Sequence, residues 1–203
     1  MSSNHLKRLA MPRSWPLPRK TTVWVTRPTP GAHALELCMP LTLVIRDVLG
    51  MAKTAREVLL HNELAMIDGR VVKDTRRGVG LMDVLTLGED NYRCVLDHNG
   101  RLQYRPISAD EASWKVCRIE GKTTIKGGRT QLNLHDGRNI IVDDPAEYST
   151  GDSLKLNLPD QKILEHIRFG EGTRAYLIGG AHVGSTADVK EYIIKRSSMP
   201  NEV

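Results

Sequence analysis

The first half of the chain has a helical hydrophobic period. Between residues 40 and 49 the apolar side chains recur at steps of three and four, which predicts a helix that ends at Gly50. Thr54 and Glu57 have the spacing of a capping box, so a second helix is predicted to begin there and to continue to about residue 62. The pattern then changes to that of strands.

Hairpin signals follow the two helices. The dipeptide Asp68-Gly69 separates the apolar residues 65–67 from residues 70–72, which is typical of a two-residue hairpin turn. Residues 78–87 read as one more extended apolar segment. Residues 40–88 are therefore expected to form two short helices and a small sheet.

From residue 91 onward the pattern is mainly that of β structure. Hairpin dipeptides at Asn99-Gly100 and Asp136-Gly137 predict strands over residues 92–96 with 102–104 and over 132–134 with 140–142. Further strands are expected at 114–119, 123–125 and 154–158, followed by a short helix over 162–167 and a glycine-rich final segment.

Charge is distributed very unevenly along the chain. Residues 1–35 contain six of the 29 Lys and Arg residues, none of the 24 acids and five of the ten prolines. Proline removes amide donors and favours extended backbone, so this segment is predicted to be a basic, extended arm with little core that becomes ordered on a polyanion. An idle disordered tail is the alternative interpretation.

Composition and motifs exclude several classes of protein. No apolar run approaches the length of a spanning helix, the first residues lack the pattern of a secretory signal, and three widely spaced cysteines fit neither a disulfide framework nor a zinc ribbon. A reducing cytoplasm is therefore expected. We find no catalytic motif and no metal-ligand spacing, and the pattern Gly170-x-Gly172-x-x-Ala175 lacks a βαβ context. We expect a binding protein without catalytic residues, cofactor, metal or small-molecule substrate.

The basic arm closely resembles the N-terminal signature of the archaeal/eukaryotic-type small-subunit ribosomal protein family S4e. The matching positions are His5, Lys7, Arg8, Leu9, Pro12, Trp15 and Leu17. Residues 27–33, 43–57, 67–71 and 79–84 are similar to later stretches of the same family, and the match continues in register over nearly the whole chain.

This resemblance implies an α+β protein of several modules. Residues 1–39 would be the extended arm, 40–88 a helix-helix-sheet RNA-binding domain, 89–168 a central β domain, and 169–203 a KOW motif, which is a small SH3-like barrel. Only 24 residues follow Gly179, so the barrel is expected to be incomplete. The implied partners are the ribosomal RNA of the small subunit and neighbouring ribosomal proteins, on cytoplasmic ribosomes and away from membranes.

Basic side chains in the arm, near the start of the second helix, and in the turns are the candidates for RNA contact. A helix N-terminus and nearby cations attract phosphate, and Trp15 would offer a stacking or packing surface. The expected RNA-binding residues are His5, Lys7, Arg8, Arg13, Trp15, Arg19, Lys20, Arg27, His33, Lys53, Thr54, Arg56, Arg70, Arg76, Arg77, Lys126 and Arg129.

Two other functions use the same features. An RNA-modifying enzyme of the pseudouridine synthase or methyltransferase type could carry a similar small RNA-binding domain, but the 115 residues after residue 88 look too short and too rich in hairpins for a catalytic domain. A free, ribosome-associated RNA chaperone would need the same contacts as a ribosomal protein.

Overall fold

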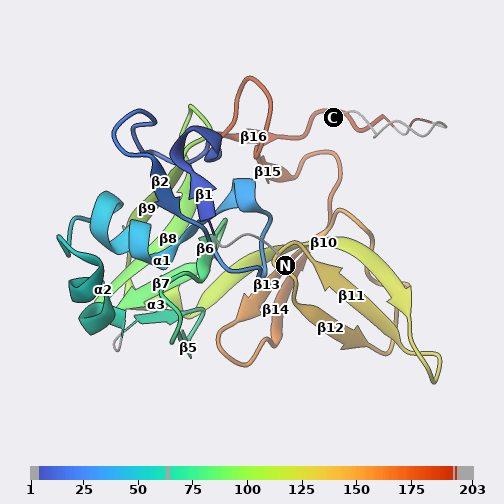
Figure 1. The fold of residues 1–203 in the computed structure, drawn as a ribbon. Helices are drawn as coiled ribbons and strands as arrows, with labels where there is room; N and C mark the ends of the chain where they lie inside the picture. Colours follow the sequence, from blue (N-terminus) through green and yellow to red (C-terminus); the bar gives the residue numbers. More distant parts are fainter. Residues whose placement is uncertain (1–4, 63–64, 194, 196–203) are drawn as a thin grey trace.

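Two five-stranded antiparallel sheets lie beside each other in the computed structural model, which describes residues 5–62, 65–193 and 195 (Figure 1). The first sheet has the order β5 (Arg70–Val71), β4 (Ala65–Ile67), β7 (Val84–Leu87), β8 (Asp90–Leu96) and β9 (Leu102–Ile107). The second has the order β12 (Asn139–Val142), β11 (Thr130–Leu134), β10 (Trp114–Thr124), β13 (Ser153–Asn157) and β14 (Ile163–Ile167). A short helix, α3 (Ala109–Ala112), joins the two sheets.

Both predicted helices are confirmed. The first consists of α1 (Leu41–Leu43), which continues as the π-helical turn η3 (Val44–Val48), and Gly50 follows it with a φ of 67°. The second, α2 (Ala55–Asn62), begins after Thr54, whose hydroxyl accepts a hydrogen bond of 3.3 Å from the backbone N–H of Glu57. This is one half of the expected cap.

The predicted hairpins are also present. Asp68 and Gly69 have φ values of 51° and 73°, the left-handed pair that a tight two-residue turn requires, and they join β4 to β5. Residues 78–87 form two strands rather than one extended segment, because a turn separates β6 (Gly78–Gly80) from β7. Strand β6 pairs with β3 (Cys38–Pro40), just after the short helical turn η2 (Leu35–Leu37).

The basic arm differs from its expectation, because it contributes to the core. It forms a two-stranded ribbon of β1 (His5–Lys7) and β2 (Trp24–Thr26), and the helical turn η1 (Arg8–Ala10) follows β1. Met11, Trp15 and Val25 are buried within the core of the first sheet. The indole Nε1 of Trp15 donates a 2.8 Å hydrogen bond to the carbonyl of Cys38. The prediction of a core-poor arm was wrong, since prolines prevent regular structure without preventing side-chain packing.

Two further expectations differ from the structure. The division between the sheets does not coincide with the predicted domain boundary at residue 88, because β8 and β9 complete the first sheet and the second sheet begins with β10. Residues 162–167 are not helical. They form β14 along the edge of β13, where the ladder satisfies more backbone groups than a single isolated helical turn would.

The final segment packs on the first sheet. Strands β15 (Arg174–Tyr176) and β16 (Thr186–Asp188) form an antiparallel ribbon, and the Tyr176 hydroxyl both donates to the carbonyl and accepts from the N–H of Leu96 in β8. These are the strands that the structure describes within residues 169–193 and 195 of the predicted KOW module, whereas residues 194 and 196–203 of that module lie outside the described residues.

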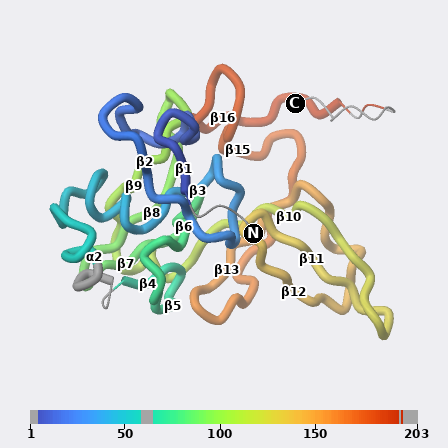
Figure 2. The backbone as a smooth tube through the Cα atoms, viewed as in Figure 1, coloured from blue at the N-terminus to red at the C-terminus, as the bar shows by residue number. Residues whose placement is uncertain are grey.

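Each sheet has its own hydrophobic core. The larger core joins the first sheet, the helices and the arm, which lies over the first sheet in the tube view (Figure 2). The smaller core belongs to the second sheet and contains Cys117, Ile119, Leu132, Leu134, Val142, Leu154 and Leu156. Among the helices of the described ranges, none has the length and apolar character needed to span a membrane.

Candidate nucleic-acid interface

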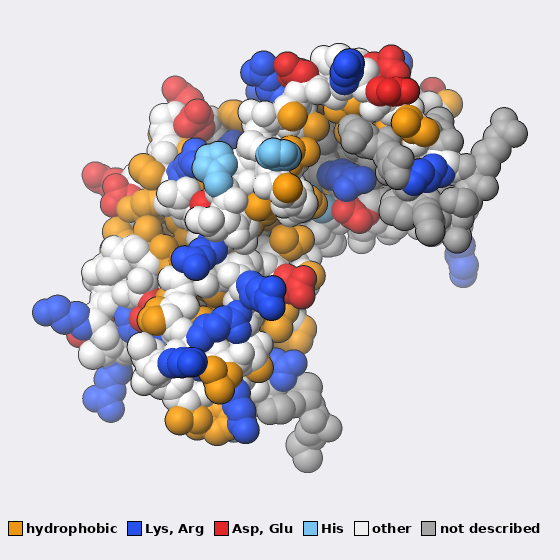
Figure 3. Space-filling view, turned by 90° about the horizontal axis from the view of Figure 1, so that it is seen from above, with side chains coloured by type: hydrophobic (Ala, Val, Ile, Leu, Met, Phe, Trp, Pro, Cys, Tyr) orange, Lys and Arg blue, Asp and Glu red, His pale blue; other side chains and the backbone are white. Residues whose placement is uncertain are grey.

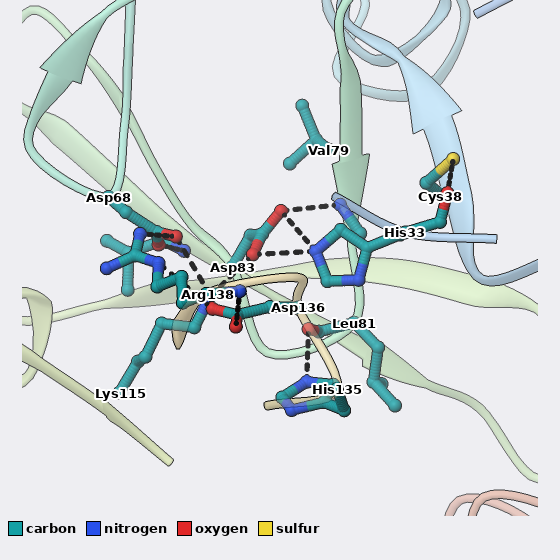
Figure 4. A network of polar contacts seen from close by, with 12 residues as sticks. His33, Cys38, Asp68, Val79, Leu81, Asp83, Lys115, His135, Asp136 and Arg138 are labelled. Atoms are coloured by element: carbon teal, nitrogen blue, oxygen red, sulfur yellow. Dashed lines mark hydrogen bonds and ion pairs between the residues drawn. The ribbon is translucent and has the colours of Figure 1, made fainter. Parts of the chain in front are cut away.

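A buried ion-pair cluster fixes the position of the two sheets relative to each other (Figure 4). The ammonium of Lys115, in β10, is fully buried and lies 2.9 Å from Asp68, 2.7 Å from Asp83 and 2.8 Å from Asp136. Asp68 and Asp83 stand in turns of the first sheet, whereas Asp136 stands in the β11–β12 turn of the second. Arg138 extends the cluster with contacts of 2.5 Å to Asp68 and 3.0 Å to Asp136. We call these five residues the junction cluster.

Charge in the junction cluster is unbalanced, because two cations face three carboxylates. Burial alone would lower the pKa of Lys115, but the charges of Asp83 and Asp68 outweigh it and hold that pKa above its ordinary value. Burial likewise acts to raise the pKa of Asp83, yet Lys115 holds it well below its usual range. For Asp68, burial and the neighbouring Asp83 together outweigh Lys115 and raise the pKa. Asp68 is therefore the carboxylate of this pair that takes up a proton more readily.

A groove of about 880 Å³ opens beside the junction cluster and brings two predicted residues together. Its basic lining residues are the predicted Arg70 and Arg77 together with Lys73 and Arg138, and four acidic residues line it as well, Asp68, Asp74, Asp83 and Asp136. One terminal nitrogen of Arg138 is buried without a hydrogen-bond partner in the part of the chain that the structure describes. Because this nitrogen is buried, Asp68 and Asp136 remain the anionic partners of the Arg138 guanidinium.

The later part of the arm lies along the same region. The backbone N–H of Thr29 donates a 3.0 Å hydrogen bond to the carbonyl of Arg76, and Thr29 forms a β-bridge with Arg77. Both arginines are exposed, and the guanidinium of Arg76 is 3.5 Å from the carboxylate of Asp74. The arm thus lies directly beside the loop that carries Arg76 and Arg77.

Three predicted arm residues have structural roles. The Arg8 guanidinium is buried, where it donates to the carbonyl of Pro18 and to the Thr22 hydroxyl. Trp15 is also buried, and its indole N–H donates to the carbonyl of Cys38. The imidazole Nε2 of His33 lies 3.0 Å from each carboxylate oxygen of Asp83. These interactions occupy polar groups that were predicted to contact RNA.

The other predicted arm residues remain nearer to the surface. Arg19 is partly buried and donates to the carbonyls of Leu9 and Met11, and Arg27 is partly buried as well. The exposed members are His5, Lys7, Arg13 and Lys20. Seen from above, the molecule displays Lys and Arg side chains on this face, with apolar side chains between them (Figure 3).

The remaining predicted residues lie at two separate places. Lys53, Thr54 and Arg56 are exposed at the start of α2. Lys126 and Arg129 are exposed at the tip of the long β10–β11 hairpin, at the opposite end of the molecule from α2 (Figure 1). The structure therefore does not gather all the predicted residues into one patch. Within the described ranges, no group of three or more His, Cys, Asp or Glu residues is arranged to hold a metal ion.

Comparisons with known proteins cover nearly the whole chain. Residues 88–163 match the family described as Ribosomal family S4e, and residues 2–36 match the RS4NT (NUC023) domain. The small ribosomal subunit protein eS4 of Methanothermobacter thermautotrophicus is 45% identical over 204 residues, which are 98% of this chain and 84% of that protein. The corresponding protein of Methanocaldococcus jannaschii is 45% identical over 210 residues, covering 98% of this chain and 85% of that one.

A solved structure gives the same relationship. The crystal structure of the 30S ribosomal protein S4e from Thermoplasma acidophilum superposes with a TM-score of 0.72 at 33% sequence identity. The superposition covers 80% of this chain and 85% of that one.

Proposed function

Because this chain belongs to the S4e family of small-subunit ribosomal proteins, we propose that it holds ribosomal RNA on the face formed by its arm and the adjoining groove. Its function is that of a structural constituent of the small ribosomal subunit, not that of an enzyme. We place it on ribosomes in the cytoplasm, in contact with small-subunit RNA and neighbouring ribosomal proteins.

One observation carries the proposal for the RNA-binding face. The first 35 residues contain six basic residues and no acid, and within them residues 5–35 fold onto the first sheet instead of forming a tail. Lys7, Arg13 and Lys20 are exposed there. Exposed cations on a fixed scaffold neutralise phosphates without having to order a flexible segment first.

The groove extends the proposed face. Arg70 and Arg77 line it with exposed side chains, which would contact phosphates at its edge, while the aspartates of the same lining would repel them. Lys53 and Arg56 near the helix start, and Lys126 and Arg129 at the hairpin tip, would make separate backbone contacts with a folded RNA.

The salt dependence of RNA binding tests the proposed face. Deleting the arm would remove Met11, Trp15 and Val25 from the core, so its charges are instead neutralised in a triple variant. Lys7→Gln, Arg13→Gln and Lys20→Gln together are expected to reduce the slope of log K against log salt by about 2 to 3, because each lost phosphate contact removes roughly 0.7–0.9 from that slope. The measurement is a filter-binding titration with small-subunit RNA at several salt concentrations.

A matched control uses three exposed basic residues outside the proposed set. Arg105→Gln, Arg118→Gln and Lys162→Gln remove the same charge and are expected to leave most of the slope in place. An equal loss of slope in both triple variants would show that the charge acts in bulk and would contradict a defined face.

Co-sedimentation separates a structural subunit protein from a free RNA chaperone. A structural component is expected to remain near one copy per small subunit through a high-salt wash, whereas a visiting chaperone is released. Loss of most of the protein in the wash would contradict a structural place in the subunit.

A further inference from the structure

Trp24 is the exposed tryptophan of the arm, in contrast to Trp15. Its side chain stands on β2 with 55% of its surface exposed, and its neighbour Val23 is 68% exposed, whereas Trp15 is only 2% exposed. Leaving a large aromatic ring in water forgoes the free energy that its burial would provide, and adjacent exposed apolar side chains often mark a contact surface. The arm therefore has an aromatic surface that the protein's own core does not use.

The surroundings of Trp24 are aromatic and basic. The His5 ring lies 5.5 Å from the Trp24 ring, centroid to centroid, at an interplanar angle of 53°. Lys7 stands directly opposite Trp24 in the β1–β2 register. Within residues 1–35 no acidic side chain offsets the positive charge. The pair of rings thus has a cation beside it in a segment whose charge attracts polyanions.

Hydrogen bonds and the burial of a neighbouring residue fix the strand that carries Trp24. The Arg8 N–H donates a 2.9 Å hydrogen bond to the carbonyl of Val23, and the Thr22 hydroxyl donates 3.2 Å to the carbonyl of Trp24. Val25, the next residue, is buried in the core. A side chain on such a strand binds with little additional loss of conformational entropy.

We propose that Trp24, supported by His5, is a stacking platform for an unpaired base of RNA. A base offers a flat π face to the ring, and Lys7 neutralises the phosphate that accompanies it. The basic, acid-free segment favours a nucleotide over an apolar patch of a protein as the occupant. This proposal rests on the proposed RNA-binding function. It adds base stacking at Trp24 to the phosphate contacts that the charged residues would make.

Substitution of Trp24 tests the platform on intact protein and protein-free small-subunit RNA. Trp24→Ala is expected to weaken binding roughly 5- to 150-fold, the loss typical of one base–aromatic stack. Trp24→Phe retains a π face and is expected to restore most of the affinity. Trp24→Leu retains apolar area without a π face and is expected to bind nearly as weakly as the Ala variant. Ile141→Ala, at an exposed apolar residue of the second sheet, is the matched control and should bind like the wild type.

The salt dependence distinguishes failure of the platform from failure of the proposed function. Stacking carries no charge, so Trp24→Ala should lower affinity by the same factor at every salt concentration and leave the slope unchanged. Wild-type affinity in Trp24→Ala, together with an intact slope, would overturn the platform and leave the RNA-binding face standing. Equal affinities of Trp24→Leu and Trp24→Phe would overturn it as well. A loss confined to the assembled subunit would assign Trp24 to a protein neighbour and would equally overturn the platform.

Discussion

Removing the central cation of the junction cluster should destabilise the protein strongly at neutral pH. In Lys115→Met the side chain keeps a similar length but loses the ammonium that contacts Asp68, Asp83 and Asp136 at 2.7–2.9 Å. Three buried carboxylates then face Arg138 as the remaining cation of the cluster. Breaking a buried ion pair on one side costs about 3–5 kcal/mol. That is a large share of the roughly 5–15 kcal/mol by which a domain is stable.

The unfolding free energies of the wild type and of Lys115→Met should change with pH in opposite directions. In the wild type the pKa of Asp83 and that of Asp136 are lowered, so the stability they confer is present above about pH 4 and is lost as pH falls below it. In Lys115→Met, burial and mutual repulsion raise the carboxyl pKa values of the folded state above those of the unfolded chain. The variant should therefore regain stability as pH falls from 7 toward 5, where the carboxyls take up protons.

Urea denaturation at pH 7, 6 and 5 measures both effects. The difference in unfolding free energy between wild type and Lys115→Met should be about 3–5 kcal/mol at pH 7 and should narrow steadily toward pH 5. Lys162→Met, at an exposed lysine, is the control and should cost little at any of these pH values. A difference below about 1 kcal/mol at pH 7, or one that does not change with pH, would refute a role for the cluster's charges in joining the sheets.

Three other changes have defined outcomes. Asp68→Asn should destabilise the protein less than Asp83→Asn in urea at pH 7, because it relieves the excess negative charge, and the reverse order would contradict the charge balance given above. Trp15→Ala should cost about 3–5 kcal/mol in the same assay, since it empties a buried site and leaves the Cys38 carbonyl without its donor; a cost under 1 kcal/mol would show that the arm does not belong to the core. Arg56→Glu should weaken binding to small-subunit RNA without lowering the melting temperature, and unchanged affinity would remove the start of α2 from the interface.

The sequence predicted local structure correctly where a pair of residues determines the backbone conformation. The Asp68-Gly69 turn and the helix cap at Thr54 follow directly from the preferences of those residues, and both are present. The segment at residues 162–167 was predicted wrongly, because the sheet edge that it joins lies elsewhere in the sequence and short apolar segments fit either structure. Strands β8 and β9 were predicted as strands of a domain over residues 89–168, and their pairing with β7 in the first sheet was not predicted.

Side-chain burial in the arm could not be predicted from composition. Proline content and net charge indicate the local backbone conformation and the attraction to charged partners. The burial of Trp15 depends instead on the position of β3, whose Cys38 lies 23 residues later in the chain. The alternation of residues along β10 does contain a signal for the junction cluster. Lys115 has the same parity as Cys117 and Ile119, both of them buried, and a lysine at an inward position of a strand requires buried acidic partners.

Crosslinking within purified small subunits locates the RNA-binding face of this protein. After ultraviolet irradiation, peptides attached to ribosomal RNA can be identified residue by residue, with the protein present at about one copy per subunit. We expect crosslinks in the arm, around Trp24 and Arg13, and in the loop that carries Arg76 and Arg77. Crosslinks confined to the β12 and β14 edges of the second sheet, with none in the arm or that loop, would contradict this expectation.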